Sequence, residues 1–202
     1  MTLKLIFLII GAVIGTAAFF PYLRDIFRRE TQPHVYTWLI WLLTQGTAVV
    51  GIWYGGGRWG ALNLYIGMIF ILGIFLFSLK YGTKNITTWD TVILIAALGA
   101  IVVWWQLNQP LLAVIMISAI DLVGYIPSLR KSYHEPYSET LKSWMAWAVS
   151  DIFALIALSE YNALTMTYLA TITIANVVLV IFCLWRRGVI MRLELKRNQK
   201  IL

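Results

Sequence analysis

Two acidic residues, Asp121 and Asp151, each lie about eleven residues inside a long apolar stretch of the sequence. No Lys or Arg lies at the same depth of either stretch. A carboxylate at the centre of a lipid bilayer costs at least about 2.5 kcal/mol, so each side chain must face protein or water, or hold a proton. The alternative to a role in solute or proton binding is a protonated acid that hydrogen-bonds a neighbouring helix. The candidate partners are Ser118, Ser150, Thr44 and Asn176.

Two tryptophans and a polar residue occur twice at the spacing i, i+3 and i+7, as Trp38, Trp41 and Gln45 and as Trp144, Trp147 and Asp151. This spacing places three side chains on one face of a helix. The outer Trp38 and Trp144 suit either an aromatic belt at the membrane surface or the interior. We expect the deeper Trp41 and Trp147 to line a pathway, with lipid contact or core packing as the alternative. A ring face there can stack on a sugar, a heterocycle or a cation.

Asn176 lies in the second half of the last apolar stretch. An amide in apolar surroundings needs hydrogen-bond partners, which a ligand hydroxyl or a neighbouring helix can supply. Asp151 and Asp121 are the residues predicted to carry a coupled proton. The residues predicted to bind a solute are Trp41, Gln45, Trp147, Asp151 and Asn176.

The composition places these residues in a membrane protein. Apolar residues make up 60% of the 202 and charged residues 12%, against roughly 45–50% and about 25% in soluble domains. The single Cys183 excludes a disulfide scaffold. A helix needs about 20 apolar residues to cross the bilayer. We expect an all-α integral membrane protein with seven transmembrane helices, at about 3–20, 35–54, 60–79, 88–107, 110–129, 140–159 and 163–185.

The basic residues orient these helices. If the N-terminus is outside, fourteen of the 16 Lys and Arg residues fall on cytoplasmic segments, and Lys4 and Arg58 stay outside. The C-terminus is then cytoplasmic and ends in a basic tail, 189–202. We interpret the net charge of +7 as a topology signal and a contact for anionic lipids, and not as nucleic-acid binding.

The region after the first span resembles the region after the fifth at a shift of 106 residues. Two Trp-x-x-Trp segments align in register at this shift, together with Pro21-Tyr22-Leu23-Arg24 on Pro127-Ser128-Leu129-Arg130 and Thr44-Gln45 on Ser150-Asp151. We therefore expect two parallel three-helix repeats, 1–82 and 110–188, joined by a linker helix within 83–109.

The two acids differ in the residues that align with them in the other repeat. The counterpart of Asp151 is the polar Gln45, which favours Asp151 as a pathway residue. Asp121 aligns with Gly15, a position that offers only space. In the third helices, Tyr65 and Tyr168 align if a gap is placed before them, and gating, belt and packing roles stay open for this pair. Asn176 aligns with Phe70 or Gly73, depending on the gap.

Pro21 and Pro127 fall near the cytoplasmic end of the first helix of each repeat. A proline inside a helix removes one backbone hydrogen bond and allows a bend. We expect both prolines to act as hinges at an inner gate.

This layout and the sequence around each proline resemble the SWEET sugar transporters and the wider PQ-loop family over about residues 5–185. The Pro-Gln pair of that family is here Pro21-Tyr22 and Pro127-Ser128. The paired Trp-x-x-Trp segments are similar to those of vitamin carriers of the PnuC type. The resemblance implies a substrate site near the membrane midplane between the repeats, with Asn176 at the depth of a substrate-binding asparagine of the last helix.

The expected function is transport of a sugar or vitamin-like polar solute by alternating access between the two bundles in the plasma membrane, with proton coupling as a secondary expectation. Expected partners are the solute and membrane lipids, and a homo-oligomer stays open. One alternative is a membrane receptor or assembly protein on the same fold. Another is a membrane enzyme with Asp121 and Asp151 as a carboxylate pair, which the absence of lipid head groups at that depth disfavours. No cofactor or metal site is expected, because His34 and His134 lie in loops.

Overall fold

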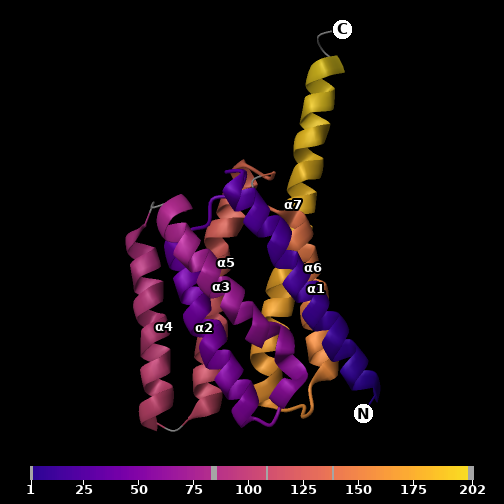
Figure 1. The fold of residues 1–202 in the computed structure, drawn as a ribbon. Helices are drawn as coiled ribbons and strands as arrows, with labels where there is room; N and C mark the ends of the chain where they lie inside the picture. The colour runs from indigo at the N-terminus through magenta and orange to yellow at the C-terminus, as the bar shows by residue number, and fades with distance from the viewer. Residues whose placement is uncertain (1, 83–85, 108, 138, 200–202) are drawn as a thin grey trace.

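The computed structural model describes residues 2–82, 86–107, 109–137 and 139–199. Nearly all of these residues are helical and none forms a strand, so the expected all-α class is confirmed. Figure 1 shows successive α-helices running in alternate directions, with the two termini at opposite ends of the molecule. The elements are α1 (Thr2–Phe27), α2 (Val35–Tyr54), the 3-10 turn η1 (Arg58–Ala61), α3 (Leu62–Tyr81), α4 (Thr88–Leu107), α5 (Pro110–His134), α6 (Leu141–Ala157) and α7 (Ala163–Gln199).

Four segments of the described chain are long and apolar enough to cross a membrane: Leu3–Phe27, Val35–Tyr54, Arg58–Tyr81 and Ala163–Leu193. The shorter described helices Thr88–Val103 and Pro110–Ile126 are also apolar. Large apolar side chains such as Ile69, Ile95 and Ile174 are more than half exposed on the helix surfaces. An apolar surface of this extent is suited to lipid and not to water, which indicates a membrane protein.

Each half of the chain packs its three helices in the same order. The third helix lies against the other two: α3 contacts α1 and α2, and α7 contacts α5 and α6. Within the described residues, the first and second helices of one half do not pack on each other. They pack on the other half instead, α1 on α6 and α2 on α5. The remaining helix, α4, lies at one side of the bundle against α2 and α5 (Figure 1).

Local sequence signals explain where several helices begin. The His34 side chain caps α2 by accepting a hydrogen bond from the backbone N–H of Thr37 at 3.4 Å. Thr87 and Asp90 form a reciprocal capping box at the start of α4. Pro110 opens α5 at a position where a backbone N–H has no helical partner anyway. His34 Nε2 also lies 3.7 Å from Asp90 Oδ2, which joins the starts of α2 and α4.

Three helices are longer than the predicted spans. α1 continues to Phe27 and α5 to His134, six and seven residues beyond Pro21 and Pro127, so both prolines lie inside helices. α7 continues to Gln199, and most of the predicted basic tail is therefore helical. Its residues are good helix formers, and Lys and Arg near a helix C-terminus interact favourably with the helix dipole. Residues 83–85, 108 and 200–202, which fall in the predicted linker and tail, lie outside the described residues.

The buried core has two parts, one on each side of the molecular centre. One contains aromatic residues from the starts of α2 and α6, such as Trp38 and Trp144. The other contains mostly aliphatic residues, such as Ile52 and Ile117, with Tyr168 among them. A cavity between the two halves of the chain is lined by residues of both parts.

Candidate functional site

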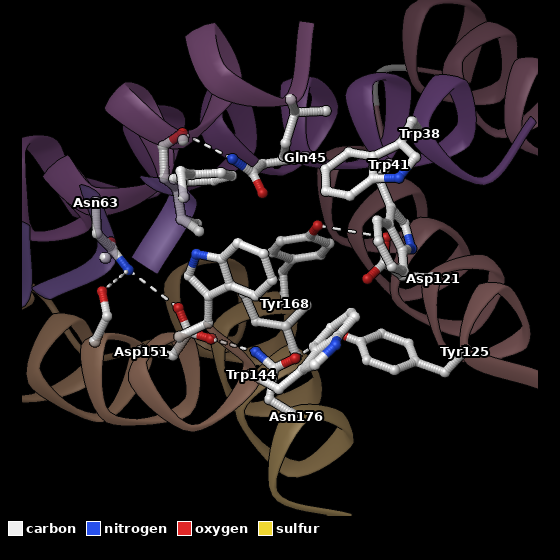
Figure 2. Close-up of a pocket in the computed structure, with 18 residues that line it drawn as sticks. Trp38, Trp41, Gln45, Asn63, Asp121, Tyr125, Trp144, Asp151, Tyr168 and Asn176 are labelled. Atoms are coloured by element: carbon white, nitrogen blue, oxygen red, sulfur yellow. Dashed lines mark hydrogen bonds between the residues drawn. The ribbon is translucent and has the colours of Figure 1, made fainter. Parts of the chain in front are cut away.

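A cavity of about 80 Å³ lies where the two halves meet, which is room for several water molecules or a compact solute. Side chains from α1, α2, α3, α5, α6 and α7 all contribute to its wall. The aromatic wall residues are Phe19, Trp38, Trp41, Trp144 and Trp147. The polar wall residues are Gln45, Asn63, Asp121, Tyr125, Ser150, Asp151, Tyr168 and Asn176, most of which are labelled in Figure 2.

Asp151 is the centre of one hydrogen-bond chain. Its Oδ1 accepts from Asn63 Nδ2 at 3.0 Å and its Oδ2 from Asn176 Nδ2 at 2.9 Å. The Tyr125 hydroxyl donates to Asn176 Oδ1 at 2.7 Å, which orients this amide with its N–H groups toward the acid. Asn63, Tyr125, Asp151 and Asn176, all labelled in Figure 2, come from α3, α5, α6 and α7. Both carboxylate oxygens therefore act as acceptors, which is the pattern of an ionised carboxylate.

Asp121 forms a second polar cluster on α5. Its Oδ1 accepts a hydrogen bond from Thr44 Oγ1 at 2.5 Å and a longer one from the Tyr168 hydroxyl at 3.4 Å. Asp121 and Asp151 are only 3% and 4% exposed. None of the described residues of the cavity wall is a Lys, Arg or His, so neither acid has a basic neighbour in the wall.

Gln45 lies in the first half at the position equivalent to Asp151, but its bond is different. Its Nε2 donates to the backbone carbonyl of Leu64 at 2.8 Å. A Cβ at Gly67 would come within 3.0 Å of the same nitrogen, so the glycine leaves room for the amide. Gly67 thus stands opposite Gln45 as Asn176 stands opposite Asp151. The alignment of Asn176 with Phe70 or Gly73 stays a prediction.

The four tryptophans form one connected group, which we call the tryptophan cluster (Trp38, Trp41, Trp144 and Trp147). Ring centroids lie 5.2 Å apart within each Trp-x-x-Trp pair and 5.9 Å apart between Trp41 and Trp144, all close to perpendicular. Tyr22 closes the ring of contacts, at 5.3 Å from Trp38 and 5.7 Å from Trp147. Trp38 and Trp144 are 3% and 2% exposed, so they are interior residues and the belt interpretation is wrong.

Three polar atoms of the wall are buried without a hydrogen bond within the described residues: the indole nitrogens of Trp41 and Trp147, and Asn63 Oδ1. An unsatisfied buried donor or acceptor costs about 1–3 kcal/mol. The two indoles occupy equivalent positions in the repeat, so the same cost recurs in both halves. A polar occupant, or a rearrangement of the cluster, can relieve it.

A second contact between the halves lies beyond the tryptophan cluster, at the end where α1 stops and α6 begins. Thr140 Oγ1 donates to Asp25 Oδ2 at 2.7 Å and lies 3.2 Å from Thr31 Oγ1. Arg24 Nη2 forms an ion pair with Asp25 Oδ1 at 2.9 Å. We call Asp25, Thr31 and Thr140 the latch. All three are buried.

The structure brings the predicted residues together. Trp41, Gln45, Trp147, Asp151 and Asn176 all line the cavity, and so does Asp121. The predicted hinges, Pro21 and Pro127, lie closer to the helix ends and are not among its described wall residues.

Other expectations about this region were wrong or incomplete. The space expected at Gly15 is filled, because a Cβ there would lie 2.5 Å from Ser150 Oγ. Tyr168 is buried against Asp121, whereas Tyr65 donates to the backbone carbonyl of Arg58 near the surface, so the two are not equivalent.

Asn63 and Tyr125 were missed by the sequence reasoning. Tyr125 follows Asp121 by four residues and so shares its helix face, a signal that was present in the sequence. Asn63 sits at the beginning of α3, and its role depends on helix packing alone. In comparisons with known proteins, no family model, curated protein or solved structure matches this chain.

Proposed function

We propose that the chain is a membrane transporter for a small polar solute, which it carries by alternating access to the central cavity. In this proposal seven helices span the plasma membrane as two parallel three-helix repeats, α1–α3 and α5–α7, with α4 as the linker. The N-terminus lies outside and the C-terminus in the cytoplasm. The solute is sugar-like or vitamin-like, as the resemblance to SWEET, PQ-loop and PnuC-type carriers implies.

The observation that carries the proposal is a set of paired contacts between the halves. Phe19 packs on Trp147 with ring centroids 4.9 Å apart, and Tyr125 packs on Trp41 at 5.5 Å. Adding 106 to Phe19 gives Tyr125, and subtracting 106 from Trp147 gives Trp41, so one contact becomes the other when the halves are exchanged. These paired contacts support a cavity between two parallel repeats, and transporters with such repeats bind their substrate at the repeat interface.

A second pair of contacts obeys the same rule. Ser150 approaches Gly15 closely, and Thr44 donates to Asp121. Gly15 and Asp121 differ by 106, as do Thr44 and Ser150. Two independent contacts related by one shift support two like-oriented bundles that meet across α1–α6 and α2–α5.

Alternating access requires the contacts at one end to separate while those at the other end hold. The latch and the tryptophan cluster join α1 and α2 to α6 at the proposed cytoplasmic end. We propose that rocking of one bundle against the other breaks these contacts and opens the cavity inward. Pro21 and Pro127 are proposed to allow the bending of α1 and α5 near that end.

A disulfide across the latch tests this motion. In a Cys183→Ser background, Asp25→Cys and Thr140→Cys together are expected to form a cross-link under oxidation and to stop solute flux into liposomes, with recovery after reduction. Each single cysteine variant is the matched control and is expected to keep its flux under oxidant. Flux that continues through a fully cross-linked protein would refute rocking at the latch.

Topology and coupling are tested separately. Lys4→Cys is expected to react with a membrane-impermeant thiol reagent from outside intact cells, and Arg192→Cys only after the cells are opened. If Asp151 carries a coupled proton, Asp151→Asn is expected to make uptake insensitive to pH, and Asp121→Asn is the parallel test. If the purified chain binds a solute but never moves it across liposomes, the receptor alternative replaces the transporter proposal.

A further inference from the structure

The cavity wall contains two buried carboxyl groups, Asp121 and Asp151. Asp151 receives amide N–H groups at both oxygens, and these donors are neutral. Asp121 receives two neutral hydroxyls. Among the described wall residues there is no Lys, Arg or His. A buried carboxylate is expensive unless it is paired, so each acid either holds a proton or takes its counter-charge from an occupant of the cavity.

A chain of hydrogen bonds orients two amide groups toward Asp151. The Tyr125 hydroxyl donates to Asn176 Oδ1, and the Asn176 amide nitrogen donates to Asp151 Oδ2. Asn63 is shared between Ser150 Oγ at 3.1 Å and Asp151, which turns a second amide nitrogen toward the acid. The wall therefore places two amide donors around the carboxyl oxygens of Asp151.

The other walls of the cavity are aromatic. Trp41, Trp144, Trp147, Phe19 and Tyr125 all face the same space, and neighbouring rings are tilted or perpendicular to one another. Rings placed at steep angles present both faces and edges to one volume. The face of an indole attracts a cation by about 0.5–2 kcal/mol, more when water is excluded. Acids backed by aromatic rings are the chemistry that selects an organic cation.

We propose that the cavity binds a compact organic cation, whose positive centre lies beside Asp151 and within the aromatic walls. This inference rests on the proposed function and narrows its substrate class. A neutral sugar would stack on the same rings but would leave the acids without a counter-charge. An inorganic ion would pair with an acid but would make no use of the rings, and the size of the cavity, about 80 Å³, suits a compact solute.

The experiment measures binding to the purified chain in lipid nanodiscs, by quenching of tryptophan fluorescence and by thermal shift. The probes are choline, tetramethylammonium, the uncharged choline isostere 3,3-dimethyl-1-butanol, glucose and sodium chloride. Choline and its isostere have nearly the same shape, so the difference between them isolates the charge. We expect choline to bind at least tenfold more tightly than 3,3-dimethyl-1-butanol.

The variants locate the charge. Asp151→Asn is expected to weaken choline binding at least tenfold, and Asp121→Asn less. Asp90→Asn is the matched control, because Asp90 is a buried acid on α4 that lies outside the cavity wall. This variant is expected to bind choline as tightly as the parent chain does. If Asp151→Asn does not fold, Trp147→Phe serves instead, which keeps an aromatic ring but weakens the cation contact, and it is expected to weaken choline more than glucose.

Each other outcome overturns the inference. Equal binding of choline and its isostere would show that charge plays no part. Stabilisation by sodium alone would point to an inorganic ion. Binding or flux of glucose without any effect of the cations would leave the transporter proposal intact and refute the inference that the solute is a cation. Absence of binding by every probe would also remove it, while the latch cross-link still tests transport on its own.

Discussion

The two halves of the cavity share one frame but differ in their polar residues. Ring contacts recur across the 106-residue shift, as between Phe19–Trp147 and Tyr125–Trp41. The polar positions do not recur: Gln45 bonds a backbone carbonyl where Asp151 bonds two amides. Both buried acids of the cavity, Asp121 and Asp151, belong to the second half. Aromatic packing thus maintains the cavity from both halves, while the second half supplies its acidic groups.

The largest expected effect tests the shared frame. Trp41→Ala and Trp147→Ala should each destabilise the chain by about 3–5 kcal/mol and abolish flux, because each removes a ring that packs on the other half. Their effects on the melting temperature in detergent should be similar. If one variant is harmless and the other unfolds, the two tryptophans are not equivalent and the frame is not shared.

The next effect tests the difference at the third helices. Asn176→Ala removes the partner of both the Tyr125 hydroxyl and an oxygen of Asp151, at about 1–3 kcal/mol for each group left unsatisfied. Gly67→Ala meets only the flexible end of Gln45 at 3.0 Å and should cost less than about 1 kcal/mol. Chemical or thermal unfolding of the two variants side by side measures the contrast, and equal losses would contradict it.

A third effect tests the close approach of α1 and α6. Gly15→Ala should cost about 1–3 kcal/mol, since the new Cβ would lie 2.5 Å from Ser150 Oγ. Adding Ser150→Ala should restore most of this loss. Gly73→Ala is the control, because nothing lies within 4 Å of its Cβ position. A stable Gly15→Ala single variant would mean that α1 and α6 are farther apart.

The smallest effect compares two equivalent hydroxyls. Thr44→Val removes a hydrogen bond to an acid, and Ser150→Ala removes one to the backbone carbonyl of Gly11. Asn63 also donates to Ser150 Oγ, but it keeps its bond to Asp151 in the Ser150→Ala variant. Bonds to charged groups contribute about 1.5–3 kcal/mol and neutral ones about 0.5–1.5 kcal/mol. Thr44→Val should therefore lower the free energy of unfolding by about 1 kcal/mol more than Ser150→Ala does. The reverse order in denaturant titrations would indicate that Asp121 is neutral in the folded protein.

Much of the site could be predicted because its residues are unusual for their surroundings. Aspartates and an asparagine in apolar stretches demand partners, and Trp-x-x-Trp at helical spacing marks one helix face. Helix class and the approximate span positions followed from the apolar runs.

The errors share a physical cause, which is that they depend on how helices face one another. Gly15 was read as open space, yet a small residue is also what close helix packing requires. The alignment of α3 with α7 stayed open at Asn176, because few side chains mark the register of these two helices. The helical continuation of α7 through the basic tail was not predicted, because basic residues mark where a span leaves the membrane and do not mark where a helix ends.

The C-terminal extension of α7 has a practical consequence. Arg186 and Arg187 donate to the backbone carbonyls of Tyr133 and Pro136, and these bonds anchor the helix where it leaves the bundle. From Gly188 to Gln199 the helix then projects from the bundle, as the yellow end in Figure 1 shows. At the helical rise per residue this segment is about 18 Å long. A reporter domain fused at Gln199 through a continuous helix would keep a fixed orientation relative to α7. Such a fusion would supply a visible landmark for aligning electron-microscope images of a 23.1 kDa particle that is otherwise hidden in its detergent belt.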